Sequence, residues 1–131
     1  MSDYLLGHGD KEWARLSAQH AVWKDTLLPI AGASGVRPGA RVLEVGCGPG
    51  VLLEDLAAAA PGASGLERDA AAVAFAQSRG LAVTQGDLMT ADLAGPWDVI
   101  VLRWVFSFLP DPALAVRLLA QALAPGGALV I

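Results

Sequence analysis

The sequence predicts an α/β fold, a Rossmann-like, doubly wound and mainly parallel sheet of about five strands flanked by helices. Three observations predict it. Short β-type runs alternate with helical stretches from residue 41 onward, the pattern of parallel βαβ units. The first run leads into a glycine-rich turn, "GCGPG", as doubly wound folds require. The chain has 131 residues, 54% of them hydrophobic, which suffices for one packed core.

An amphipathic helix is expected at the N-terminus, over residues 10–28. Its apolar and aromatic residues recur every three or four positions, at Trp13, Leu16, His20, Trp23 and Leu27. Pro29 is expected to end it, and residues 31–40 read as a connector. We therefore divide the chain into a helical lid and linker (1–40) and a core (41–131).

The core elements follow in alternation. The expected strands are residues 41–45, 63–67, 81–85, 98–102 and 128–131, and the expected helices are residues 51–60, 70–79 and 112–123. Asp69 and Asp111 stand where an N-cap is needed. Pro125-Gly126-Gly127 is expected to form a turn before the last strand.

The composition argues against several classes of partner and site. The formal net charge is −4 and no basic run exists, so neither nucleic acid nor an anionic membrane is an expected partner. The single cysteine, Cys47, offers no disulfide framework and no metal-ligand spacing. No secretory signal and no membrane-spanning apolar run is present. We expect a cytoplasmic protein that takes a small-molecule substrate and no metal, and the sequence leaves its oligomeric state open.

The glycine-rich turn indicates the ligand. Its glycines, Gly46, Gly48 and Gly50, allow sharp turning and close approach of a ligand to the main chain. The dinucleotide pattern G-x-G-x-x-G fails because Val51 occupies its last place, and no Lys-Ser/Thr pair makes a phosphate loop. Glu44 would repel a pyrophosphate but favour an ammonium or sulfonium group. S-adenosylmethionine carries both.

Two further acids stand after the next strands. Glu67 lies 21 residues after Gly46, near the spacing of about 20 for an acid that binds ribose hydroxyls. Asp87 follows the third strand, where a carboxylate can accept from an adenine amino group. Each has a plainer interpretation as well: Glu44 and Glu67 as solvated acids, and Asp69 or Asp87 as helix caps.

These stretches resemble the class I S-adenosylmethionine-dependent methyltransferases, through "VLEVGCGPG", "GLERD", "QGDL", "WDVIVLRWVFSFLPDP" and "LAPGGALVI". The resemblance, closest to small-molecule members, implies that the glycine loop holds the methionine end, Glu67 the ribose, and Asp87 with Leu88 the adenine. The expected cofactor-binding residues are Glu44, Gly46, Cys47, Gly48, Gly50, Glu67, Arg68, Asp87, Leu88 and Arg103.

The sequence indicates less clearly which residues would contact the methyl acceptor. Tyr4, His20 and Trp104 are candidate substrate contacts, although the stripe containing His20 equally suits core packing. Arg103 either holds a carboxylate or solvates a strand end. Methyl transfer by in-line displacement needs alignment more than a base, so no catalytic residue is assigned. The alternatives are a non-catalytic S-adenosylmethionine-binding or partner module and a nicotinamide-dependent oxidoreductase.

The last predicted strand, "ALVI", is expected to pair with residues 98–102 and to leave its other side unpaired. The family fold continues with antiparallel strands at this point. We therefore expect the 131 residues to be a truncated chain, since natural sheets protect such edges.

Overall fold

The computed structural model describes residues 9–131. Its helices are α1 (Asp10–Ala33), α2 (Val51–Ala59), α3 (Ala70–Ser78), the 3₁₀ turn η1 (Phe106–Phe108) and α4 (Pro112–Ala122). Its strands are β1 (Val42–Val45), β2 (Ser64–Glu67), β3 (Ala82–Gln85), β4 (Trp97–Val101) and β5 (Leu123–Val130). No helix of this described part is long and apolar enough to cross a lipid bilayer.

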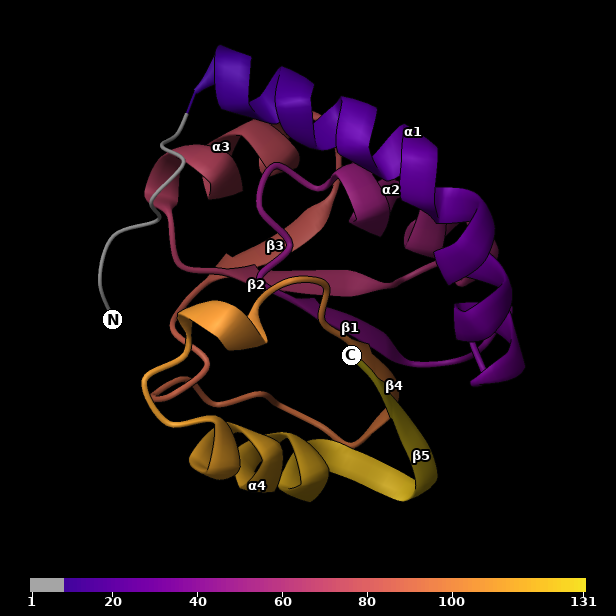
Figure 1. Cartoon of the computed structure of the whole chain (residues 1–131). Coiled ribbons are helices and arrows are strands. Elements are labelled where there is room, and N and C mark those ends of the chain that lie inside the picture. The colour runs from indigo at the N-terminus through magenta and orange to yellow at the C-terminus, as the bar shows by residue number, and fades with distance from the viewer. Residues whose placement is uncertain (1–8) are drawn as a thin grey trace.

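The strands form one parallel sheet in the order β3-β2-β1-β4-β5. In Figure 1, α1, α2 and α3 lie on one side of this sheet and α4 lies on the other. The expected Rossmann-like, doubly wound arrangement is therefore confirmed. The order reverses between β1 and β4, so the loops that follow these two strands diverge and leave a crevice between them.

Both faces of the sheet are buried, which explains why the central strands read as nearly continuous apolar runs. All four residues of β1 are buried. One apolar cluster includes Val42, Leu53 and Val99, and the second includes Leu43, Ile100 and Leu119. Asp69 and Asp111 cap α3 and α4, as expected, by accepting bonds from the main-chain N–H groups three residues ahead.

Pro29 does not end the first helix, contrary to the expectation from sequence. The helix α1 continues through it to Ala33, and in Figure 1 it changes direction over its last turns. A proline inside a helix costs about 3 kcal/mol, but the following turn reaches the core: Ala31 is 1% exposed and its carbonyl accepts a bond from Val36 N–H at 3.0 Å. Burial of this turn offsets the lost hydrogen bond.

The turn expected at Pro125-Gly126-Gly127 is also wrong, because these residues lie inside β5. Leu123 pairs with Trp97 and Ala128 with Val99, so the intervening residues form an irregular bulge. A side chain at Gly127 would lie 2.9 Å from Trp97 O, which explains the need for glycine. Proline is tolerated because β5 is at the edge of the sheet.

Candidate functional site

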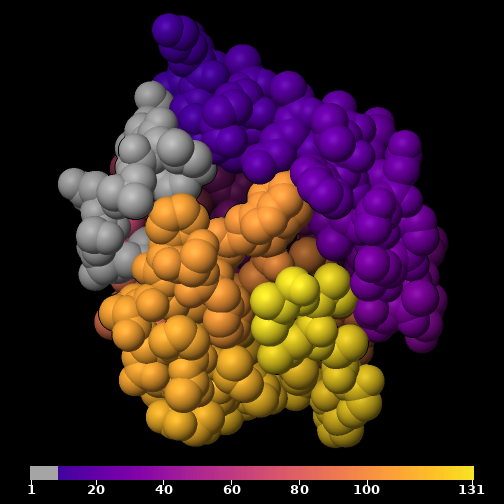
Figure 2. All heavy atoms as spheres, in the orientation of Figure 1, coloured from indigo at the N-terminus to yellow at the C-terminus, as the bar shows by residue number. Residues whose placement is uncertain are grey.

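A cavity of about 580 Å³ opens at the carboxyl ends of the strands, a volume typical of small-molecule sites. Figure 2 shows the segment after β4, in orange, meeting α1, in purple, above a hollow in this face. Ten residues expected from sequence line the cavity: Glu44, Gly46, Cys47, Gly48, Glu67, Arg68, Asp87, Leu88, Arg103 and Trp104. Gly50 and His20 are not among the lining residues, and Tyr4 lies outside the described residues.

The glycine loop lies on the floor of the cavity in a conformation that favours glycine. Gly46 and Gly48 have φ of 72° and 56°, the left-handed region. A side chain at Gly46 would meet Val105 Cγ2 at 2.5 Å, whereas one at Gly48 would meet no heavy atom within 4 Å. The space above Gly48 is therefore open for a ligand. Gly50 has a structural place instead, as the N-cap of α2.

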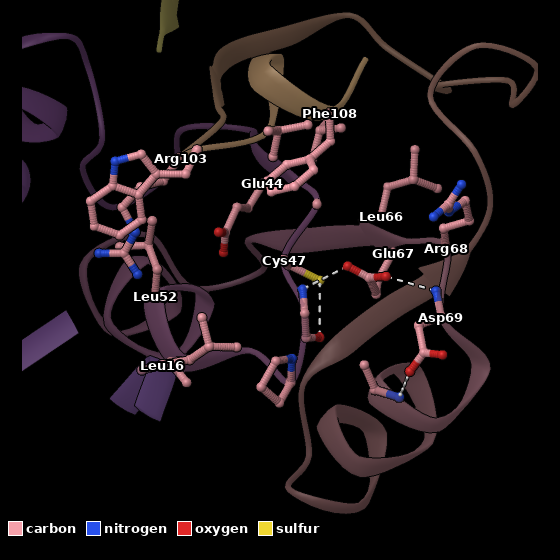
Figure 3. A pocket seen from close by; sticks show the side chains of 18 of the residues that line it. Leu16, Glu44, Cys47, Leu52, Leu66, Glu67, Arg68, Asp69, Arg103 and Phe108 are labelled. Atoms are coloured by element: carbon pink, nitrogen blue, oxygen red, sulfur yellow. Dashed lines mark hydrogen bonds between the residues drawn. The ribbon is translucent and has the colours of Figure 1, made fainter. Parts of the chain in front are cut away.

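Glu67, at the end of β2, fastens this loop to the start of α3. Its Oε1 accepts from Gly48 N–H at 2.9 Å and its Oε2 accepts from Asp69 N–H at 2.7 Å (Figure 3). Asp69 in turn accepts from Ala72 N–H at 2.8 Å, as a helix cap. Each Glu67 oxygen keeps a second lone pair, so the carboxylate can also accept from ligand hydroxyls.

Glu44, next to the last residue of β1, presents a buried carboxyl group to the same cavity. It is 3% exposed, and its Oε1 has no hydrogen-bond partner among residues 9–131. Burial raises the pKa of Glu44 to about 8; the Arg103 charge opposes this rise and the Glu67 charge adds to it. In Figure 3, bonds are drawn to Glu67 but none to Glu44. A buried carboxyl oxygen without a hydrogen-bond partner, in a cavity, makes Glu44 a candidate ligand-binding residue.

Asp87, after β3, has a partner within its own loop. Its Oδ1 accepts from Met89 N–H at 2.9 Å, and its carbonyl accepts from Thr90 and Ala91 N–H groups. This arrangement is a local turn resembling a helix cap. Leu88 is buried beside it, at 5% exposure. The sequence interpretation of Asp87 as an adenine contact stays a prediction.

Arg103, in the segment after β4, lies between Glu44 and the first helix. Burial lowers its pKa, and the charges of Glu44 and then Asp55 oppose this change. Its Nη1 lies 2.8 Å from His20 Nδ1. Because both ring nitrogens of His20 are engaged within the protein, nothing here supports a direct contact between His20 and a substrate.

Trp104 forms part of the cavity rim. It is 48% exposed and has φ of 58°. This conformation is uncommon for a bulky residue, and such strained conformations tend to occur at functional sites. The Arg103 guanidinium lies 5.2 Å from its ring centroid, and Trp23 of α1 meets it edge-on at 6.2 Å. A substrate contact at Trp104 remains a prediction, now with a suitable location.

Sequence reasoning did not single out most of the residues of the cavity wall, although it expected the first helix to be a lid. Helix α1 contributes Glu12, Trp13, Arg15, Leu16 and Gln19, and the segment around η1 contributes Val105, Ser107, Phe108 and Leu109. The α1 periodicity signalled a buried face, but it could not show that this face covers a cavity rather than only core. The segment around η1 carried no regular pattern.

Cys47 is not suited to act as a nucleophile, because burial raises the pKa of its thiol well above the ordinary value. Its thiol contacts the position where Gly65 would carry a side chain, so it fills space beneath the loop. Residues 9–131 contain no group of three or more side chains placed to hold a metal ion.

Comparison with known proteins identifies the family. Residues 14–131 match the methyltransferase domain family. This chain belongs to that family. The match covers every strand of the sheet and most of α1, and it includes all the residues that line the cavity except Glu12 and Trp13.

Relatives of this methyltransferase domain act on different small molecules. It is 34% identical to a ubiquinone biosynthesis O-methyltransferase of Ralstonia nicotianae, over 80% of this chain and 44% of that one. It is 36% identical to a trans-aconitate 2-methyltransferase of Methylobacterium nodulans, over 70% and 37%. The S-adenosylmethionine-bound amino pentose methyltransferase CalS10 of Micromonospora echinaspora has a TM-score of 0.77 and 31% identity, over 98% and 57%. The chain thus spans less than half the length of these curated relatives.

Proposed function

We propose that this chain binds S-adenosylmethionine and is the cofactor-binding part of an enzyme that methylates a small-molecule acceptor. The buried carboxyl of Glu44, whose Oε1 has no hydrogen-bond partner among the described residues, supports this most directly. A cationic ligand would pair with it, whereas a nicotinamide dinucleotide would bring its pyrophosphate toward it.

The lining residues fit the parts of this cofactor. Glu44 would take the ammonium group and Arg103 the carboxylate of the methionine end, because both side chains line the cavity and interact electrostatically with each other. The free lone pairs of Glu67 would accept from the ribose hydroxyls, with Arg68 beside it. Asp87 and Leu88 would flank the adenine. The open space above Gly48 lets the ligand approach the main chain.

The cofactor supplies an activated methyl group, because its sulfonium makes the thioether a good leaving group. The residues of this chain hold the two reactants in line and exclude water. The wall above the glycine loop is apolar, from Leu16 on α1 and from Val105, Phe108 and Leu109 around η1. No general base is needed for an acceptor that is already a good nucleophile.

The acceptor is proposed to be a small molecule, as for the relatives' named substrates. Arg103, Trp104 and Phe108 lie in the segment that follows β4, where acceptor and cofactor would meet. With a net charge of −4, nucleic acid is not a proposed acceptor. A reduced, buried Cys47 suits a cytoplasmic location.

Calorimetric titration with S-adenosylhomocysteine and, separately, with NADH tests the proposal. We expect binding of the first only, and preferential binding of NADH would overturn it. Glu67→Ala should weaken S-adenosylhomocysteine binding by roughly 1.5 to 3 kcal/mol, the range for hydrogen bonds to a charged group. Glu54→Ala, an exposed acid on α2 that lies outside the cavity, is the control and should bind normally.

A further inference from the structure

A buried histidine joins three elements behind the cavity. His20 of α1 is 5% exposed, its Nε2 lies 2.5 Å from Asp55 Oδ2 on α2, and its Nδ1 lies 2.8 Å from Arg103 Nη1. Asp55 and Arg103 are both partly exposed. The histidine is therefore the buried centre of a chain of hydrogen bonds that ends on a cavity-lining cation.

The chemistry of the partners fixes the roles of the ring nitrogens. A guanidinium can only donate, so Nδ1 accepts from Arg103 and carries no proton. The carboxylate of Asp55 accepts, so Nε2 carries the proton and donates it. This is the neutral tautomer, held from both sides. A histidine in this state supplies a directed acceptor to Arg103 without neutralising its charge.

Without a hydrogen-bond partner that fixes its position, Arg103 would be poorly oriented to bind a ligand. Its long side chain loses rotamer freedom when it is fixed, and Arg103 stands in a segment without regular structure, next to the strained Trp104. The bond to His20 fixes one end of the guanidinium in advance. The remaining donors stay available to the cavity.

We propose that His20, oriented by Asp55, is a positioning residue that holds the Arg103 guanidinium in the cavity as the binding group for the cofactor's carboxylate. The inference rests on the proposed function. It also makes the docking of α1 part of the recognition site, because the acceptor for Arg103 comes from that helix. The edge-on contact of Trp23 with Trp104 joins the same two segments.

The probes are S-adenosylhomocysteine and S-adenosyl-3-thiopropylamine, which is the same molecule without its carboxylate. The measured quantity is the ratio of their two dissociation constants, obtained by calorimetry. The wild-type chain should prefer the carboxylate-bearing probe by about tenfold or more, as expected for a charge-assisted hydrogen bond. Arg103→Ala should bring this ratio close to one.

Two substitutions of His20 separate positioning from packing. In His20→Asn the amide oxygen is bonded to Cγ, as Nδ1 is, so it can still accept from Arg103. In His20→Gln the amide reaches the place of Nε2 and keeps only the contact to Asp55. The asparagine variant should retain most of the tenfold preference, and the glutamine variant should lose it.

A third variant, Asp55→Ala, leaves the buried His20 ring in place. Because the Asp55 side chain is 39% exposed, we expect this variant to fold normally. Its preference should fall between those of the wild type and His20→Gln. Lys24→Gln, on the exposed side of α1 and away from the cavity, is the matched control and should keep the full ratio.

A purely structural His20 would weaken both probes equally and leave the ratio unchanged in every His20 variant, which would overturn the inference. A wild-type ratio near one would overturn it too, because Arg103 would then not contact the carboxylate. Failure of the wild type to bind either probe would instead overturn the proposed function, and the inference with it.

Discussion

Glu44 occupies a position that a folded protein normally fills with an apolar residue. Its neighbours in β1, Leu43 and Val45, are buried in the sheet, and the Glu44 carboxyl is buried with them. Burying an unpaired carboxylate is costly, so the group responds by holding its proton. We attribute this costly placement to the proposed role of Glu44 in binding a ligand.

This burial makes the stability of the free protein depend on pH. The pKa of Glu44 is about 8 in the folded chain, against 4.5 for the free side chain. Between these values the folded state holds a proton that the unfolded state releases, so stability falls as pH rises, by up to about 1.4 kcal/mol per pH unit. Urea unfolding at several pH values should show this slope for the wild type and its loss in Glu44→Gln.

Ligand binding should release the same proton. A cationic ammonium beside Glu44 favours the carboxylate, so near pH 7 about one proton should leave per S-adenosylhomocysteine bound. Calorimetry in phosphate and in Tris, which have different ionisation enthalpies, measures that number. Glu44→Gln should release none. Identical binding enthalpies for the wild type in both buffers would show that Glu44 is not the partner of the ammonium.

At the residue scale, the cavity-lining residues that could be predicted from the sequence are those at or next to the end of a strand. Glu44 and Glu67 were found because parallel strands bring their carboxyl ends to one edge, and both line the cavity. Asp55 was not, because Glu54 and Asp55 are adjacent acids on one helix and only packing distinguishes them. Whether His20 faces the ligand or another side chain likewise depends on tertiary contacts.

At the element scale, an aromatic contact holds the part of α1 that lines the cavity. Trp13 of α1 packs on Phe75 of α3, with ring centroids 4.5 Å apart and planes inclined by 33°, and Trp13 also lines the cavity. Trp13 therefore fastens the cavity-covering part of the first helix to the third. Opening this end of α1 would expose the cavity to solvent.

Trp13→Ala should therefore weaken the binding of S-adenosylhomocysteine. Aromatic pairs contribute about 0.5 to 1.5 kcal/mol beyond area burial, so we expect a loss of roughly threefold to tenfold in affinity, mainly through faster dissociation. Stopped-flow dissociation rates test this, and limited proteolysis should show faster cleavage within α1. Trp13→Phe keeps an aromatic ring and should behave nearly as the wild type; equal rates in all three proteins would contradict a closing role for α1.

Element order and type were predictable from periodicity, but two element ends were not. Pro29 and Pro125 are both strong local breakers, and the structure keeps both inside regular elements. In the first case the burial of Ala31 sustains the helix. In the second, pairing of Leu123 with Trp97 extends the strand across a bulge. The tendency of proline to end a helix or strand is overridden where tertiary contacts of the residues that follow it contribute more to stability.

At the scale of the whole molecule, the two edges of the described sheet differ. The edge strand β3 has four residues, and Thr84 and Gln85 expose polar side chains there. The opposite edge strand, β5, has eight residues and a mostly apolar sequence. Short, polar edges resist pairing with other chains, and long, apolar ones invite it. The expected pairing of the last strand with residues 98–102 is confirmed.

We expect the 131-residue chain, studied alone, to self-associate through the outer side of β5. That side has no strand partner among residues 9–131, and Ile131 beyond it is 67% exposed. Sedimentation velocity over a range of concentrations should show reversible association. Ile131→Lys adds a charge next to the edge without disturbing packing, so it should shift the chain toward monomer and reduce the concentration dependence of the melting temperature. A wild-type chain that remains monomeric and melts cooperatively at every concentration would show that the β5 edge is protected without a partner.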